Sequence, residues 1–214
     1  MTLPGDLLVD GQRRIEMLYG LDPLAPVTDF VIPHEEAAVY PGGGSRTLVK
    51  EEGELVSVGI VFEDAVACRL READPRVRLD SANLHAFATL TEEVSHFVYV
   101  LFCAEVARSV TQLELELQAE VDKYLTAFAL LSLQNEGAVA HGLRQALFRR
   151  YRLRDGLTPE KIERYRAASQ LADRYCGWLE ARFLRQGRLP ELAREARRFY
   201  RLGQGEKLAR ISGL

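Results

Sequence analysis

The sequence AFATLTEEVSHFVYVLFCAEVARSVTQLELELQAEVDKYLTAFALLSL, residues 86–133, decides the fold of this chain. Placed on a helical wheel at about 100° per residue, its first half is apolar on nearly every side. A helix with this pattern is typically buried on nearly every face. We therefore predict a core helix over residues 86–106, with His96 inside the protein.

The second half of the stretch predicts a helix over residues 111–133. Thr111 is a suitable N-cap, and Glu114 follows it at the spacing of a capping box. An apolar stripe then continues between two rows of carboxylates. The alternation of Leu and Glu in residues 113–117 also fits a strand, but the helical period extends far beyond it, so a helix is preferred.

The segments before this helix pair predict a small sheet. Residues 47–50 and 55–62 are β-rich and flank a short turn with Gly53, which is typical of a hairpin. Residues 28–32 predict a further short strand that ends at Pro33. The sheet is thus expected between about residues 28 and 62.

Amphipathic patterns and cap residues predict further helices outside the central pair. Their expected ranges are 7–21, 63–72, 143–153, 158–185 and a last one from about residue 190. The predicted fold class is α+β and α-dominated: a five- or six-helix bundle with a small N-terminal antiparallel β-sheet or hairpin. We expect residues 1–79 to form the N-terminal α/β segment with the hairpin and residues 80–214 to form the bundle, packed together as one compact unit.

The composition is that of a soluble globular protein, with 47% hydrophobic and 28% charged residues. No apolar run is long enough to cross a bilayer, and the N-terminus lacks the pattern of a secretory signal. The three cysteines fit neither a disulfide framework nor a zinc site, and they predict small buried hydrophobes in a reducing compartment: Cys68, Cys103 and Cys176. We therefore expect a cytoplasmic protein without a membrane partner.

Charge is distributed unevenly along the chain. Residues 1–138 contain 10 Lys and Arg against 23 Asp and Glu, whereas residues 139–214 contain 18 against 8. Arginine makes up 16 of the 18 cations in the second part. Such asymmetry indicates either an anionic partner for the basic part or docking of the two parts on each other.

One pattern in the first central helix suggests a metal site. Glu93 and His96 lie at the i, i+3 spacing by which a bundle helix offers a carboxylate and an imidazole to a metal ion. Glu92, and Glu120 of the next helix, would supply further oxygen ligands. A di-iron carboxylate site needs a second Glu-x-x-His, which the sequence lacks. The alternative is a buried His96 that is hydrogen-bonded to Glu92, Tyr99 or a backbone carbonyl and holds the bundle in register.

A second pattern combines arginines with aromatic residues, in residues 149–152, 164–166 and 197–201. Arginine donates bidentate hydrogen bonds to phosphate, and exposed aromatic rings stack on bases. The candidate nucleic-acid-binding residues are Arg149, Arg150, Arg152, Arg197, Arg198 and Arg201. The alternative is that Tyr165 and Phe199 face the core, with arginines extending past them and some pairing with the acidic central helix.

Motifs for catalysis are absent from the sequence. The glycine triplet at residues 42–44 lacks the order of strand, glycine-rich loop, Lys-Ser/Thr and helix that defines a phosphate-binding loop, so a flexible loop is expected. No Ser or Cys lies in a Gly-flanked turn of the kind that presents a nucleophile.

Three functional hypotheses follow from these patterns. The first is a non-catalytic soluble interaction protein, whose acidic N-terminal part and Arg-rich C-terminal part select a protein partner by complementary charge; a homo-oligomer is compatible with it. The alternative is an RNA- or DNA-binding protein that uses the C-terminal Arg/Tyr clusters. The second alternative is a metal-dependent helical-bundle enzyme centred on His96, with a divalent metal ion as its cofactor. The first hypothesis requires no cofactor.

Overall fold

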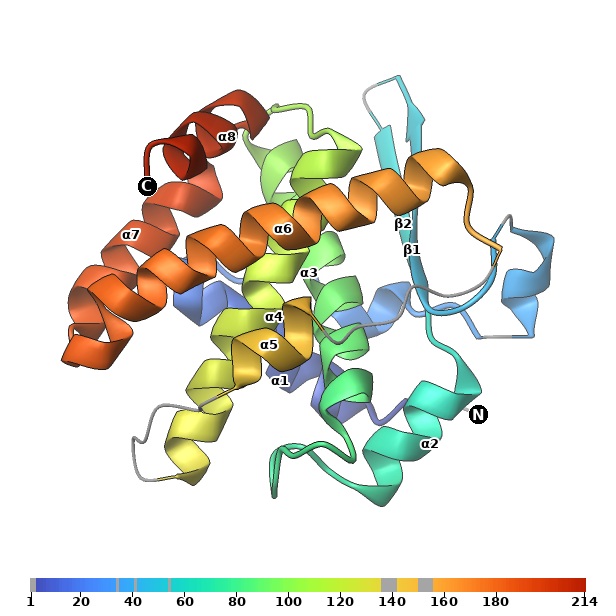
Figure 1. The fold of residues 1–214 in the computed structure, drawn as a ribbon. Coiled ribbons are helices and arrows are strands. Elements are labelled where there is room, and N and C mark those ends of the chain that lie inside the picture. The colour runs from blue at the N-terminus through green and yellow to red at the C-terminus, as the bar shows by residue number, and fades with distance from the viewer. Residues whose placement is uncertain (1–2, 34, 41, 54, 136–141, 150–155) are drawn as a thin grey trace. The chain divides into compact units, whose positions relative to one another are not determined.

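A computed structural model describes residues 3–33, 35–40, 42–53, 55–135, 142–149 and 156–214. These residues form eight α-helices and one two-stranded antiparallel sheet, which lies in the N-terminal part of the chain (Figure 1). The α-dominated α+β class predicted from the sequence is confirmed. No helix in the described ranges is both long and apolar enough to cross a membrane.

Contacts within the chain define two compact units. Unit 1 comprises Met1–Met17 with Leu21–Arg108, and unit 2 comprises Leu18–Gly20 with Ser109–Leu214. The boundary expected from the sequence lay at residue 79 instead, which would place the first central helix with the later helices. The division into residues 1–79 and 80–214, packed together as one compact unit, stays a prediction.

Unit 1 is built from helices, a hairpin and two short 3₁₀ helices. In chain order these are α1 (Gly5–Tyr19, whose last two residues belong to unit 2), η1 (Val27–Phe30), η2 (Glu36–Val39), β1 (Arg46–Glu52), β2 (Leu55–Val61), α2 (Asp64–Glu72) and α3 (Leu84–Glu105). Helix α3 packs against α2 and against both strands. His96 is only 7% exposed, which confirms the prediction that it lies inside the protein.

The predicted hairpin is confirmed, and the predicted strand at 28–32 is wrong. Strands β1 and β2 pair from Arg46↔Val61 to Glu52↔Leu55. Before them, η1 occupies most of the predicted strand, and Val31 alone forms a single parallel bridge to Ile60. The reason is local: the backbone N–H of Val27 donates to Gln12 Oε1 at 2.8 Å, which holds the segment after Pro26 as a turn with Val27 buried.

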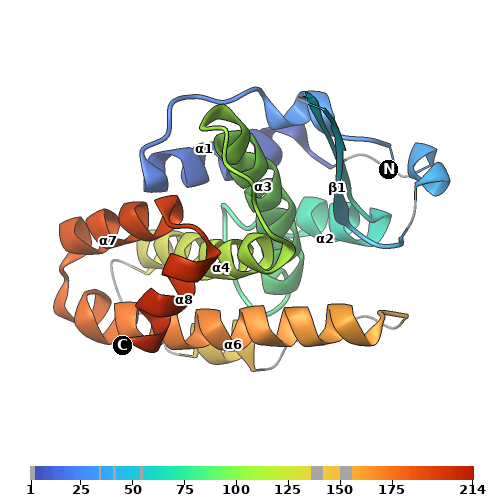
Figure 2. The ribbon, with the colours of Figure 1, turned by 90° about the horizontal axis from the view of Figure 1, so that it is seen from above.

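Unit 2 contains α4 (Gln112–Gln134), α5 (Leu143–Phe148), α6 (Pro159–Arg182), η3 (Leu184–Gln186), α7 (Leu189–Arg201) and α8 (Gln204–Ser212). Helix α6 packs along α4 and also contacts α5 and α8 (Figure 2). The predicted N-cap at Thr111 is confirmed, since its Oγ1 accepts from Glu114 N at 3.1 Å. Thr158 caps α6 in the same way, with its Oγ1 accepting from Lys161 N at 3.4 Å. The single helix expected from about residue 190 is divided into α7 and α8 at Gly203.

Two of the three cysteines are buried as predicted. The side chains of Cys103 on α3 and Cys176 on α6 are buried, whereas that of Cys68 on α2 is half-buried. On α2 the Cys68 thiol donates a hydrogen bond to Glu72 Oε1 at 3.2 Å, because both side chains lie on the outer side of this helix. All three thiols are free.

Candidate functional site

In unit 1, a buried polar cluster forms where α3 packs against β1. Thr47 Oγ1 donates a hydrogen bond to Glu93 Oε2 at 2.8 Å, and His96 Nδ1 lies 3.8 Å from the same oxygen. Glu93 is 4% exposed. Burial raises the pKa of the Glu93 carboxyl, and the contacts with His96 and Thr47 act in the opposite direction. The cluster joins the core helix to the hairpin.

Glu93 provides a carboxylate that meets His96 in this cluster. Glu92, which was named above as an alternative partner of His96, is half-buried. Helical side chains lean toward the helix N-terminus, so the residues at i−3 and i−4 are both within reach of His96. Here Thr47 of β1 supplies a donor to Glu93, and this places the buried acid.

The four candidate metal ligands are not assembled into one described site. Among the described residues, no group of three or more His, Cys, Asp or Glu side chains could hold a metal ion. Glu93 and His96 come together in unit 1. Glu120 belongs to unit 2, where its Oε1 accepts from Lys123 Nζ at 2.9 Å. The metal hypothesis therefore stays a hypothesis that rests on two of its four residues.

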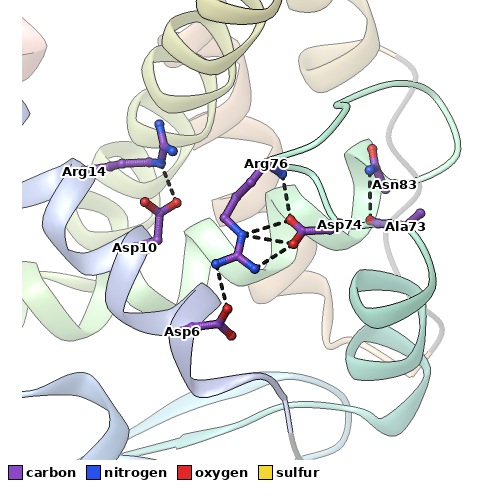
Figure 3. Close-up of polar contacts among 7 residues, drawn as sticks. All are labelled: Asp6, Asp10, Arg14, Ala73, Asp74, Arg76 and Asn83. Carbon is purple, nitrogen blue, oxygen red and sulfur yellow. Dashed lines mark hydrogen bonds and ion pairs between the residues drawn. The ribbon is translucent and has the colours of Figure 1, made fainter.

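A second polar cluster of unit 1 fixes the loop between α2 and α3 (Figure 3). Arg76 Nη2 pairs with Asp74 Oδ2 at 2.6 Å, and Arg76 Nη1 pairs with Asp6 Oδ2 at 2.8 Å. Asn83 Nδ2 donates to the carbonyl of Ala73 at 3.0 Å. The hydrogen bonds from Arg76 lower the pKa of Asp74. These contacts have a structural role, because every group in them is engaged with its neighbour.

The candidate nucleic-acid-binding arginines have different environments in unit 2. Arg149 Nη2 pairs with Asp173 Oδ2 at 3.2 Å. Arg197 and Arg201 donate to backbone carbonyls at the end of α1. Arg198 is exposed and makes no hydrogen bond or ion pair with any described residue. The two remaining candidates, Arg150 and Arg152, lie outside the described residues.

The aromatic side chains beside these arginines on α7 are buried. Phe199 stacks on Tyr175 with ring centroids 4.0 Å apart, and Tyr200 stacks on Tyr19 at 3.9 Å. Neither Phe199 nor Tyr200 presents a ring to solvent, so neither offers a surface for base stacking. Tyr165 on α6 is half-buried, with the Arg164 guanidinium 5.5 Å from its ring centroid.

One side of α7 carries a row of exposed arginines. At about 100° per residue they fall within about 100° of arc, opposite the buried side of the helix. We call them the arginine face: Arg194, Arg197, Arg198 and Arg201. The two acids of α7 form ion pairs with other arginines, Glu191 with Arg188 at 3.1 Å and Glu195 with Arg210 at 2.9 Å, and the charge of Arg194 also helps to lower the pKa of Glu191. Arg194 was missed by the sequence analysis, although it lies one turn before Arg198.

A buried network of charged and polar groups lies between α4, α8 and the end of α1. Lys207 Nζ donates to Gln118 Oε1 at 2.7 Å, and Gln118 Nε2 donates to Asp122 Oδ1 at 2.8 Å. Tyr19 also donates its hydroxyl to Asp122 Oδ1. Lys207 and Asp122 are both 0% exposed. Burial and the Asp122 charge raise the pKa of Tyr19. The sequence analysis missed this network, because it took the polar flank of α4 as a carboxylate row and did not place Lys207.

The charge asymmetry follows the two units. Unit 1 contains 9 Lys and Arg against 18 Asp and Glu, and unit 2 contains 19 against 13. The acidic helix α4 therefore lies in the basic unit. There Glu116 Oε1 lies 3.7 Å from Arg164 Nε, and Glu114 Oε2 accepts from Gln204 N at 3.2 Å. Part of the arginine excess thus serves pairing inside unit 2.

Comparison of the chain with protein-family models, with curated proteins and with solved structures found no match. The geometry of these clusters is therefore the basis for assigning a function.

Proposed function

We propose that the protein is a non-catalytic interaction protein that binds an acidic protein partner through the arginine face of α7. The observation that carries this proposal is the exposure of four arginines on one side of this helix. Arg194 and Arg198 make no hydrogen bond or ion pair with any described residue. A surface of one charge sign favours partners of the opposite sign and accelerates their encounter.

An acidic protein fits this surface better than a nucleic acid does. Recognition of single strands combines cationic side chains with exposed aromatic rings. On α7 the aromatic rings of Phe199 and Tyr200 are buried. Arg149, another candidate for binding phosphate groups, instead pairs with Asp173.

The length of the arginine face indicates the size of the partner segment. From Arg194 to Arg201 the helix rises by about 10 Å, at about 1.5 Å per residue. A short acidic segment with a few carboxylates on one side matches this length. Guanidinium–carboxylate pairs at an exposed surface are weakened by salt, so the complex is expected to be salt-sensitive.

The test is a titration of the full chain with a fluorescent oligoglutamate peptide and, separately, with single-stranded RNA, each at low and at physiological salt. We expect the peptide to bind, and the double variant Arg194→Glu/Arg198→Glu to weaken binding by about tenfold or more, equivalent to about 1.4 kcal/mol. Arg13→Glu, at an exposed arginine of unit 1, is the matched control and should leave binding unchanged.

Two results would contradict the proposal. RNA binding that is tighter than peptide binding and is lost in the double variant would assign the arginine face to nucleic acid. Absence of peptide binding at low salt would show that exposed arginines on α7 do not form a site.

A further inference from the structure

Two arginines of the arginine face are also engaged with the end of α1. Arg197 Nε donates to the carbonyl of Leu18 at 3.2 Å, and Arg201 Nη1 donates to the carbonyl of Tyr19 at 3.1 Å. The last carbonyls of a helix lack intrahelical donors and carry its negative dipole end. The two guanidiniums therefore cap α1.

The capped segment, residues 18–20, is held in unit 2 by Tyr19. Its ring stacks on Tyr200 at 3.9 Å, its hydroxyl donates to Asp122, and Gln118 Nε2 donates to that hydroxyl at 3.1 Å. Gly20 completes the fit. It adopts φ +59°, and a Cβ atom there would lie 3.2 Å from Arg197 Cζ.

We propose that residues 18–20 form an autoinhibitory contact of the arginine face. This inference rests on the proposed function. When the segment is docked, Arg197 and Arg201 donate to its carbonyls. When the segment leaves, the N–H groups of Arg197 and Arg201 that donate to its carbonyls become available to the carboxylates of an acidic partner.

The competition follows from the strength of the two kinds of hydrogen bond. A guanidinium gains more from a carboxylate than from a neutral carbonyl, because the two opposite charges attract and the pair can form two parallel hydrogen bonds. The acidic partner therefore competes with the docked segment for the same N–H groups. The buried contacts of Tyr19 oppose its release. By linkage, a change that weakens docking must strengthen partner binding, and partner binding must weaken docking by the same factor.

The test uses the oligoglutamate titration with variants of the docked segment. Tyr19→Ala removes the ring stack and both hydrogen bonds, and Gly20→Ala places a Cβ against Arg197. We expect Tyr19→Ala to bind the peptide about fivefold tighter or more, and Tyr19→Phe, which keeps the ring, to show a smaller gain. Val9→Ala, at an exposed position of α1, is the control with unchanged affinity.

A triple variant and a hydrogen-exchange measurement on the wild type complete the experiment. Adding Arg197→Gln and Arg201→Gln to Tyr19→Ala should abolish the gain in affinity, because the gain depends on these two donors. The peptide should accelerate amide exchange of residues 19–21 in the wild type, and this readout remains decisive if Tyr19→Ala does not fold.

The outcomes separate the two proposals. If the segment variants bind the peptide like the wild type, or if exchange at residues 19–21 does not change, the autoinhibitory contact is refuted while the arginine face stands. If the wild type does not bind the peptide at low salt, both proposals are refuted.

Discussion

Replacing Lys207 with Met tests the buried network of unit 2, because it removes the ammonium and keeps a side chain of similar length. The variant loses a hydrogen bond of 2.7 Å to Gln118 and a cation–π contact of 5.1 Å to Phe199. A hydrogen bond to a charged group contributes about 1.5–3 kcal/mol, and a cation–π contact about 0.5–2 kcal/mol. Gln118 bridges Lys207 to the buried Asp122, and breaking one side of a buried charge pair costs about 3–5 kcal/mol in total.

Removal of the buried ammonium relieves its own desolvation, so we expect the lower end of this range. The free energy of unfolding of unit 2 should fall by about 3 kcal/mol. Lys161→Met, at an exposed lysine of α6, is the matched control and should change it by less than about 0.5 kcal/mol.

The chain offers a convenient probe for this measurement. Trp178 is its only tryptophan, and it lies in unit 2 with the Arg210 guanidinium 4.7 Å from its ring and the Phe183 ring 5.3 Å away. Urea unfolding followed by tryptophan fluorescence therefore reports on unit 2. Adding Asp122→Asn to Lys207→Met should recover part of the loss, since both charges are then absent. If Lys207→Met unfolds within about 0.5 kcal/mol of the wild type, the network does not stabilise unit 2 as argued.

Three further predictions concern titration and thiol chemistry. Burial raises the pKa of Glu93, so the folded state binds the proton of this carboxyl group more tightly than the unfolded state does. Glu93→Gln should therefore be more stable than the wild type at neutral pH. The urea midpoints of the two proteins, followed by circular dichroism, should converge as the pH falls through the raised pKa. The pKa of Asp74 is lowered, so its contribution to the free energy of unfolding is present above the unfolded pKa of about 3.9 and is lost as the pH falls through the folded pKa. Asp74→Asn should be less stable than the wild type at neutral pH, by less than about 1 kcal/mol, and equal to it in acid. Under native conditions Ellman's reagent should modify the half-buried Cys68 first, and Cys103 and Cys176 only on unfolding.

The helices were predictable because their signals are local. The apolar period of residues 86–133 and the caps at Thr111 and Thr158 depend on neighbours within one or two turns, and the structure places the helix starts within two residues of the prediction. The hairpin around Gly53 is equally local.

Contacts between distant segments were beyond the reach of the sequence. The strand predicted at 28–32 was lost to the hydrogen bond between Gln12 and Val27, which lie 15 residues apart. The buried position of Glu93 beside His96 involves a hydrogen bond from Thr47, 46 residues before Glu93. Helical period places a residue on a face, but it does not say which distant side chain meets that face.

The candidate site shows the same division. The helical period of residues 189–201 predicts that Arg198 is exposed and Phe199 is buried, because the polar side of an amphipathic helix faces solvent and the apolar side faces the core. The engagement of Arg197 and Arg201 with the end of α1 involves positions about 180 residues away, and no local pattern encodes it.

The buried network also sets the order in which unit 2 acquires its structure. Tyr19 and Gln118 are 99 residues apart, and Gln118 and Lys207 are 89 residues apart. Contacts of such separation form late in folding, after local helices. Helices α4 and α6 are able to form early, but the Asp122 carboxylate gains its Tyr19 donor only when the chain between residues 19 and 122 has closed. A fragment of residues 109–214 would therefore fold without the Tyr19 ring that stacks on Tyr200. A peptide of residues 18–20 that is added to this fragment should accelerate the last step of its folding.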